Sequence, residues 1–340
     1  MIEDQRDRSS GASSRPLTLQ TSQTSPGTIL RVGTGASALR RLLRDEAFIV
    51  APGVHDMFAL RAIEDAGFAS AAISGAVMSQ AMLGMPDIGL LTLDQSVEHC
   101  RRLVRAARIP ITADADAGFG NPMGVRYSVQ LFEEAGAAGI NIEDQVVPRR
   151  WAGAPGKEVV SMGEMVAKIE AAVKARRDGD FVLIVRTDAF ACETLAQVLE
   201  RARAYEAAGA DLLMPIGPPD GTAVACLVES LDIPVSINVG NGLEPAASAG
   251  RLSIPCLRAL GVRRVSLPQL LPAVGAAAMQ RGLAALQGIA RTGQGAASAL
   301  DDLALADLRQ LMRDADGLAL EEGLLHRGQD ARSSPVPLNT

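Results

Sequence analysis

A repeating unit of apolar and polar residues occupies the middle of the chain. Each unit starts with a short run of apolar residues rich in β-branched side chains, passes through a turn and continues into a longer stretch rich in Ala, Leu, Glu and Arg. Short apolar runs bounded by turn residues are typical of strands. The eight predicted strands lie at residues 48–54, 70–75, 110–116, 139–144, 181–188, 211–217, 234–240 and 263–268.

The longer stretches between these runs are predicted as helices. In residues 97–107 and 195–210, apolar residues recur at intervals of three and four, and several such stretches end in glycine. Strands that alternate with helices pair in parallel, and eight such units close into a barrel more naturally than into an open sheet. The predicted fold class is therefore α/β, a (β/α)8 TIM barrel. The alternative is a doubly wound sheet, which predicts a GxGxxG turn that residues 51–56 do not contain.

Both ends of the chain differ from this middle region. The first 36 residues are rich in Ser, Thr, Gly and Arg without an apolar segment, which favours a disordered tail over a secretory signal. Further helices are predicted at 270–290 and 300–325, either as a subunit contact or as a cap on the base of the barrel. The predicted organisation is a tail at 1–36, a barrel at 37–290, a C-terminal helical extension at 291–330 and a tail at 331–340.

Composition narrows the range of partners. The net charge of -6 and the aromatic content of 3% argue against nucleic acid. The apolar runs are shorter than the roughly 20 residues that a membrane-spanning helix needs. The four cysteines lack metal-binding spacing, which is consistent with reduced thiols in a cytosol. We therefore expect a cytoplasmic enzyme with a small-molecule substrate.

Acidic residues end two neighbouring predicted strands, where the active site of a barrel lies. Asp114 and Asp116 stand at alternate positions, so both are expected to face the mouth of the barrel. Glu143 adds a third acid, and the mutual repulsion of the three calls for a cation. Oxygen ligands without His or Cys favour Mg²⁺ or Mn²⁺ over zinc. The alternative is a structural ion network of these acids with Arg149, Arg150 and Arg186.

Five sequence segments carry a resemblance to a known family. They are DADAGFGNPMGV at 114–125, AGAAGINIEDQVVPRR at 135–150, GKEVVS at 156–161, AKIEAAVKARRD at 167–178 and FVLIVRTDA at 181–189. In order and spacing, roughly residues 45–240 resemble the isocitrate lyase and phosphoenolpyruvate mutase superfamily. The resemblance implies a barrel with Mg²⁺ and a tetramer that exchanges a C-terminal helix. It also implies 2-oxo or 2-hydroxy acid substrates that pass through a pyruvate-type enolate.

The resemblance assigns roles to individual residues. Arg186 matches an arginine that binds a carboxylate, and residues 74–76 match a segment that holds a carboxylate or enolate oxygen. Asp87 matches a further acid at the metal site. The expected metal residues are Asp87, Asp114, Asp116 and Glu143, and the expected substrate-binding residues are Ser74, Gly75, Ala76, Arg186 and Asn238.

One loop departs from the pattern of the family. Lyases of the family carry KKCGH or KRCGH after the fourth strand, and the cysteine of this motif is the catalytic acid. Residues 149–153 here are Arg-Arg-Trp-Ala-Gly, so that Trp151 takes the position of the cysteine. An indole N–H does not supply a proton at neutral pH. Cleavage of a 2-hydroxy acid requires such an acid, whereas decarboxylation of a 2-oxo acid requires less.

The sequence supports three functional hypotheses. The first is an Mg²⁺-dependent lyase of the oxaloacetate decarboxylase type, with Arg186, His55 and Ser74 as catalytic residues. The second is a C–C lyase of the methylisocitrate or dimethylmalate type, or a phosphonomutase-like enzyme, with His55 as the substitute acid. The third is a non-catalytic barrel that binds a carboxylate.

Overall fold

The computed structural model describes residues 35–45, 48–150, 155–240, 252–292, 305–314, 317–319 and 321–322. The predicted tails lie outside this part of the chain, except that residues 35 and 36 begin a helix rather than end a tail. Much of the predicted extension at 291–330 also lies outside it.

Eight parallel strands form two sheets within the described residues. The strand orders are β1-β8-β7 and β2-β3-β4-β5-β6. Single parallel bridges link Gly53 to Ala72 and Leu213 to Val235, so each edge of one sheet meets an edge of the other. Each strand lies inside a predicted run, which confirms the α/β fold with parallel strands. The strands are β1 (Ile49–Pro52), β2 (Ala71–Ala72), β3 (Ile111–Asp114), β4 (Gly139–Glu143), β5 (Val182–Thr187), β6 (Leu212–Pro215), β7 (Ser236–Asn238) and β8 (Arg264–Leu267).

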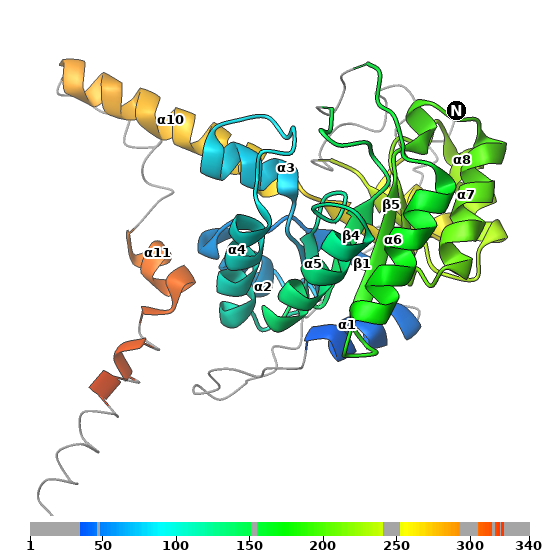
Figure 1. Cartoon of the computed structure of the whole chain (residues 1–340). Helices are drawn as coiled ribbons and strands as arrows, with labels where there is room; N and C mark the ends of the chain where they lie inside the picture. The colour runs from blue at the N-terminus through cyan, green and yellow to red at the C-terminus, as the bar shows by residue number, and fades with distance from the viewer. Residues whose placement is uncertain are drawn as a thin grey trace, which may run out of the picture.

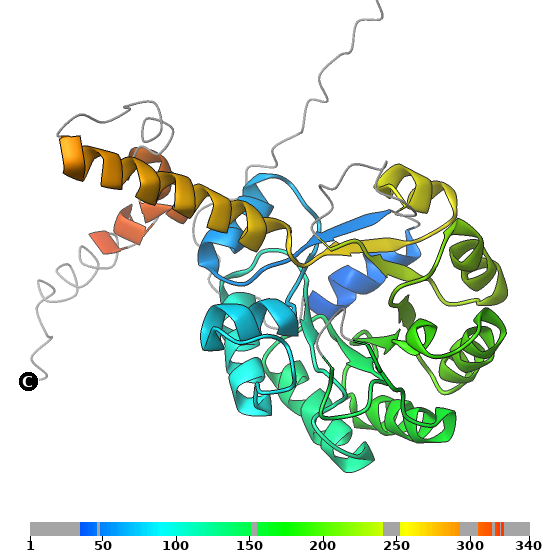
Figure 2. The same cartoon turned by 90° about the horizontal axis from the view of Figure 1, so that it is seen from above.

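Helices surround the strands, as the view from above shows (Figure 2). Polar caps fix where several of them begin. Asn121, for example, accepts hydrogen bonds from the backbone N–H groups of Met123 and Gly124, and Pro122 opens the helix. The helices are α1 (Gly35–Arg44), α2 (Met57–Asp65), α3 (Gly75–Met78), η1 (Ser79–Leu83), α4 (Leu93–Ala106), α5 (Pro122–Glu134), α6 (Met162–Ala175), η2 (Ala189–Ala191), α7 (Leu195–Ala207), α8 (Gly221–Ser230), α9 (Ile254–Ala259), α10 (Leu270–Thr292) and α11 (Leu305–Met312).

Apolar packing leaves one end of the strands for chemistry. The main core lies between strands and helices, where Phe132 and Tyr205 are fully buried. A smaller apolar cluster brings Leu39 of α1 against Ile49 and Val182, at the amino ends of β1 and β5. Helix α1 therefore closes the amino ends of the strands, and polar groups collect at the carboxyl ends.

Helix α10 projects away from the rest of the molecule (Figure 1). None of its residues is buried, although it carries large apolar side chains. It confirms the helix predicted at 270–290, but its direction does not fit a cap on the base of the strands. Helix α11 confirms part of the second predicted helix, and after it Arg313 pairs with Asp65 of α2 at 3.0 Å. No helix in the described ranges combines the length and the apolar character needed to span a membrane.

Candidate active site

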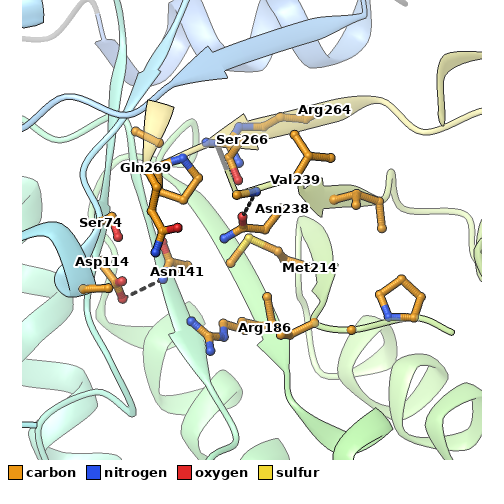
Figure 3. A pocket seen from close by; sticks show the side chains of 18 of the residues that line it. Ser74, Asp114, Asn141, Arg186, Met214, Asn238, Val239, Arg264, Ser266 and Gln269 are labelled. Atoms are coloured by element: carbon orange, nitrogen blue, oxygen red, sulfur yellow. Dashed lines mark hydrogen bonds between the residues drawn. The ribbon is translucent and has the colours of Figure 1, made fainter. Parts of the chain in front are cut away.

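A cavity of about 770 Å³ opens at the carboxyl ends of the strands (Figure 3). Residues of β2 to β8 and of the loops that follow them contribute to its wall. This is the end of the strands where the sequence places the site. Its polar lining residues are Ser74, Asp87, Asp114, Asn141, Arg149, Lys157, Arg186, Asn238, Ser253, Arg264, Ser266 and Gln269.

Asp114 ends β3 and is held in one orientation. Its Oδ2 accepts the backbone N–H of Gly75 at 2.9 Å, and its Oδ1 accepts the side-chain amide of Asn141 at 2.8 Å. A Cβ on residue 75 would lie 3.1 Å from Oδ2, so glycine allows this close approach. The N–H of Gly75, predicted to bind substrate, is therefore used to orient Asp114, and Gly75 does not line the cavity.

Asp116 reaches the same cluster by a different route from the one expected. Strand β3 ends at Asp114, so the strand alternation predicted for the two acids is wrong. Asp116 has φ 44°, a left-handed conformation that aspartate adopts more readily than most residues. This turn brings its carboxylate beside Asp114, although it does not line the cavity. Burial, with the charge of Asp114, raises the pKa of Asp116 to about 7.

The guanidinium of Arg149 lies among the acids. Its Nη1 is 2.6 Å from Asp87 Oδ2 and 2.8 Å from Asp116 Oδ1, and its Nη2 is 3.2 Å from Glu143 Oε1. Arg149 itself is buried. Three of the four acids expected to bind a metal are thus paired with this arginine, as the ion-network alternative predicts. Among the described residues, Arg150 has no ion pair with them.

Arg186 is also paired with carboxylates. Its Nε donates a hydrogen bond to Asp188 Oδ2 at 2.8 Å, and its Nη2 donates one to Asp188 Oδ1 at 3.1 Å. Its Nη1 lies 3.0 Å from Glu143 Oε2. Lys157 Nζ also contacts Asp188, at 2.8 Å from its Oδ1. Burial alone would raise the pKa of Asp188, but Arg186 and Lys157 lower it to about 2. Burial raises the pKa of Glu143 to about 8, against the effect of both arginines.

Another buried carboxylate, Asp144, is hydrogen-bonded to the segment that carries Asp188. It accepts hydrogen bonds from the Thr187 hydroxyl at 2.7 Å, the Asp188 N–H at 2.9 Å and the Tyr205 hydroxyl at 2.8 Å. Burial raises the pKa of Asp144, while these bonds lower it. The sequence analysis gave this residue no role. It follows Glu143 directly, and alternation along the strand places it on the opposite face.

The other predicted site residues divide into two groups. Ser74, Ala76 and Asn238 line the cavity. His55 does not line it, and its Nε2 lies 3.6 Å from Asp56 instead. A catalytic His55 therefore stays a prediction without support from this geometry. Trp151 lies outside the described residues.

Several cavity residues were missed by the sequence analysis, among them Asn141, Lys157 and Arg264. Asn141 precedes Glu143 by two positions on β4, and Arg264 precedes Ser266 by two positions on β8. Residues two positions apart on a strand face the same side, so alternation would have placed Asn141 and Arg264 on the inner face. Lys157 belongs to a loop, where no periodicity indicates direction. Its only signal was the family segment GKEVVS.

The four acids have the oxygen atoms that a divalent cation prefers as ligands, but their side chains are not arranged around a metal site in this structure. Carboxylate oxygens are ligands for Mg²⁺, and Glu143 Oε1 is buried without a hydrogen-bond partner. Within the described part of the chain, however, no three acidic, His or Cys side chains surround one point as metal ligands do. The reason is local, because the Arg149 guanidinium stands between Asp87 and Asp116.

Residues 39–287 match the family model described as phosphoenolpyruvate phosphomutase. The chain therefore belongs to this family, and the resemblance seen in the sequence is confirmed. It is 37% identical to oxaloacetate decarboxylase from Rhodopseudomonas palustris over 83% of this chain and 93% of that protein. It is 42% identical to 2,3-dimethylmalate lyase from Eubacterium barkeri, over 55% of this chain and 64% of the lyase.

Solved structures extend the comparison. Phosphonopyruvate hydrolase in complex with oxalate and Mg²⁺ has a TM-score of 0.71 and 29% sequence identity, and the match covers 85% of this chain and 98% of that one. The similarity thus spans nearly the whole of that neighbour.

We predict that Asp144→Ala lowers the free energy of unfolding by about 3 kcal/mol, because three buried donors lose their acceptor. Urea denaturation measures the change. Asp232→Ala, which removes an exposed aspartate, is the matched control and should change stability little. A loss below about 1 kcal/mol for Asp144→Ala would contradict the stabilising role of this hydrogen-bond network.

Proposed function

We propose that this chain is a metal-dependent carbon–carbon lyase that decarboxylates oxaloacetate or a similar 2-oxo acid. The observation that carries the proposal is the convergence of Asp87, Asp114, Asp116 and Glu143 beside a cavity with further polar groups. The proposal takes the two sheets as arcs of one (β/α)8 barrel with this cavity at its mouth. The long alignment with an oxaloacetate decarboxylase supports the choice of substrate.

The proposed reaction breaks the bond between C3 and the C4 carboxylate of oxaloacetate. Carbon dioxide leaves, and the electron pair passes from C3 towards the 2-oxo oxygen until C3 takes a proton from solvent. A bound Mg²⁺, held by Asp114, Asp116 and their neighbours, would stabilise negative charge on that oxygen. The Ser74 hydroxyl lines the cavity and can donate a hydrogen bond to the substrate. No protein acid has to protonate a leaving enolate before carbon dioxide departs.

A second candidate is cleavage of a 2-hydroxy acid of the dimethylmalate or methylisocitrate type. The 42% identity to 2,3-dimethylmalate lyase favours it. The candidate needs a proton donor in place of the family cysteine, and His55 does not line the cavity. Phosphonomutase-like chemistry and carboxylate binding without turnover are further outcomes of the same assay.

We predict pyruvate release from oxaloacetate with Mg²⁺, above the rate without enzyme, and its loss in EDTA. Asp114→Asn should lower the rate by about 100-fold, since this acid lines the cavity. Asp94→Asn, at an exposed position of α4, is the control and should leave the rate unchanged. The panel also contains 2,3-dimethylmalate, 2-methylisocitrate and phosphonopyruvate.

The outcomes of this assay separate the candidates. Turnover of a 2-hydroxy acid instead of oxaloacetate would replace the decarboxylase with the second candidate. Turnover of phosphonopyruvate would favour phosphonomutase-like chemistry. Ligand binding without any product would favour a binding protein.

We predict that Arg149 competes with the metal. A cation cannot bind between Asp87 and Asp116 until the guanidinium leaves, so Arg149→Gln should bind Mg²⁺ about tenfold more tightly. Isothermal titration calorimetry measures this affinity without turnover. Arg150→Gln, one residue along the same loop, is the control. Equal or weaker Mg²⁺ binding by Arg149→Gln would contradict the competition.

We also propose that α10 packs against a second copy of the chain. Met279, Leu283 and Leu286 are spaced by four and three residues and are each more than half exposed, so they form one apolar stripe. The family resemblance implies such an exchange of a C-terminal helix.

We predict that Met279→Glu with Leu283→Glu lowers the molar mass in light scattering, because two charges would enter a buried interface. Gln280→Glu with Gln287→Glu adds the same charge to α10 at polar positions and should leave the mass unchanged. A wild-type protein that is already monomeric would refute the assembly.

A further inference from the structure

Four cationic side chains line the cavity, and three of them have carboxylate partners. Arg149 pairs with Asp87, Asp116 and Glu143, as described above, and Arg186 and Lys157 share Asp188. Arg264 differs, since no described carboxylate lies within ion-pairing distance of it. An anion that enters the cavity therefore meets an unmatched positive charge at Arg264.

Arg264 is fixed in place by neutral groups. Its Nη1 donates to the Ser236 hydroxyl and its Nη2 to the Thr112 hydroxyl, both at 3.1 Å, while its Nε has no partner. A guanidinium has five N–H donors, so these two bonds leave three without an acceptor in the described structure. The side chain is only 2% exposed. Burial lowers the pKa of Arg264 to about 10, so the group stays charged at neutral pH.

A buried charge without a counter-ion is costly. The effective penalty is several kcal/mol, and an apolar side chain of similar volume would fill the same space without it. A purely structural link among β3, β7 and β8 therefore does not explain why an arginine stands here. A site that receives an anion during function does explain it.

The position of Arg264 suits a substrate group that points away from the acids. Arg264 and Ser266 alternate on β8 and both line the cavity, and Ser266 is the register partner of Asn238 on β7. Figure 3 shows this polar group on the opposite side of the cavity from Arg186. A ligand between the two sides would offer one end to the acid cluster and the other to Arg264.

We propose that Arg264 is a specificity-determining residue that binds one carboxylate of a dicarboxylate substrate. The inference rests on the proposed function in one respect, that the substrate occupies this cavity. It deepens that function by assigning the second carboxylate of the substrate to Arg264. Arg186 does not need to bind this carboxylate, because it is already paired with Asp188 and Glu143.

The test compares malonate with malonamate, which replaces one of the two carboxylates with an amide of similar size. Isothermal titration calorimetry in Mg²⁺ gives both affinities for each variant. We expect wild type to prefer malonate by about 30-fold or more, and Arg264→Gln to reduce the preference below about threefold. Arg264→Lys should retain part of it, and Arg105→Gln, an exposed arginine on α4, all of it. An undiminished preference in Arg264→Gln would overturn the assignment.

A crystal structure of the wild-type protein with malonate keeps the inference testable if Arg264→Gln does not fold. A malonate carboxylate within hydrogen-bond distance of Arg264 supports it, and malonate bound elsewhere overturns it. Neither measurement needs turnover. Failure to decarboxylate oxaloacetate would therefore refute the proposed reaction alone, whereas turnover with an unchanged malonate preference in Arg264→Gln would refute the role of Arg264 alone.

Discussion

Arg149 holds together carboxylates that would otherwise repel one another inside the protein. Its guanidinium lies within 3.2 Å of carboxylate oxygens of Asp87, Asp116 and Glu143. Arg186 adds a second positive charge, 3.0 Å from Oε2 of Glu143. Burial raises the pKa values of Asp116 and Glu143 even with these cations present, and both values would be higher still without them. The ends of β3, β4 and β5 depend on this balance, because each contributes an acid or a cation to it.

The same interaction links the site to a loop. Arg149 comes at the end of the segment that follows β4, so a cation that replaced its guanidinium would free this part of the chain from Asp87 and Asp116. Binding of a metal would then be coupled to the position of this loop, because the cation and the Arg149 guanidinium would exchange places at the same acids. Asp114 takes no part in the exchange, since Gly75 and Asn141 orient it independently of Arg149.

Periodicity predicted the fold well, because strand and helix patterns follow from local burial. All eight strands lie within the predicted runs. The side-chain arrangement of the site was harder to predict, because it depends on contacts between distant loops. Asp116 uses a left-handed turn that alternation does not reveal, and Arg149 was an alternative rather than the favoured partner of the acids. Arg264 had no motif, and its role emerges only when every neighbouring charge is known.

The central claim is that Arg149 and a divalent cation compete for the same acids. Crystal structures of the protein grown with and without Mg²⁺ test it most directly. The account predicts that Mg²⁺ binds beside Asp114 and Asp116, that the Arg149 guanidinium leaves Asp87 and Asp116, and that the pair between Arg186 and Asp188 persists. Mg²⁺ bound at these acids with Arg149 still between Asp87 and Asp116 would contradict the claim.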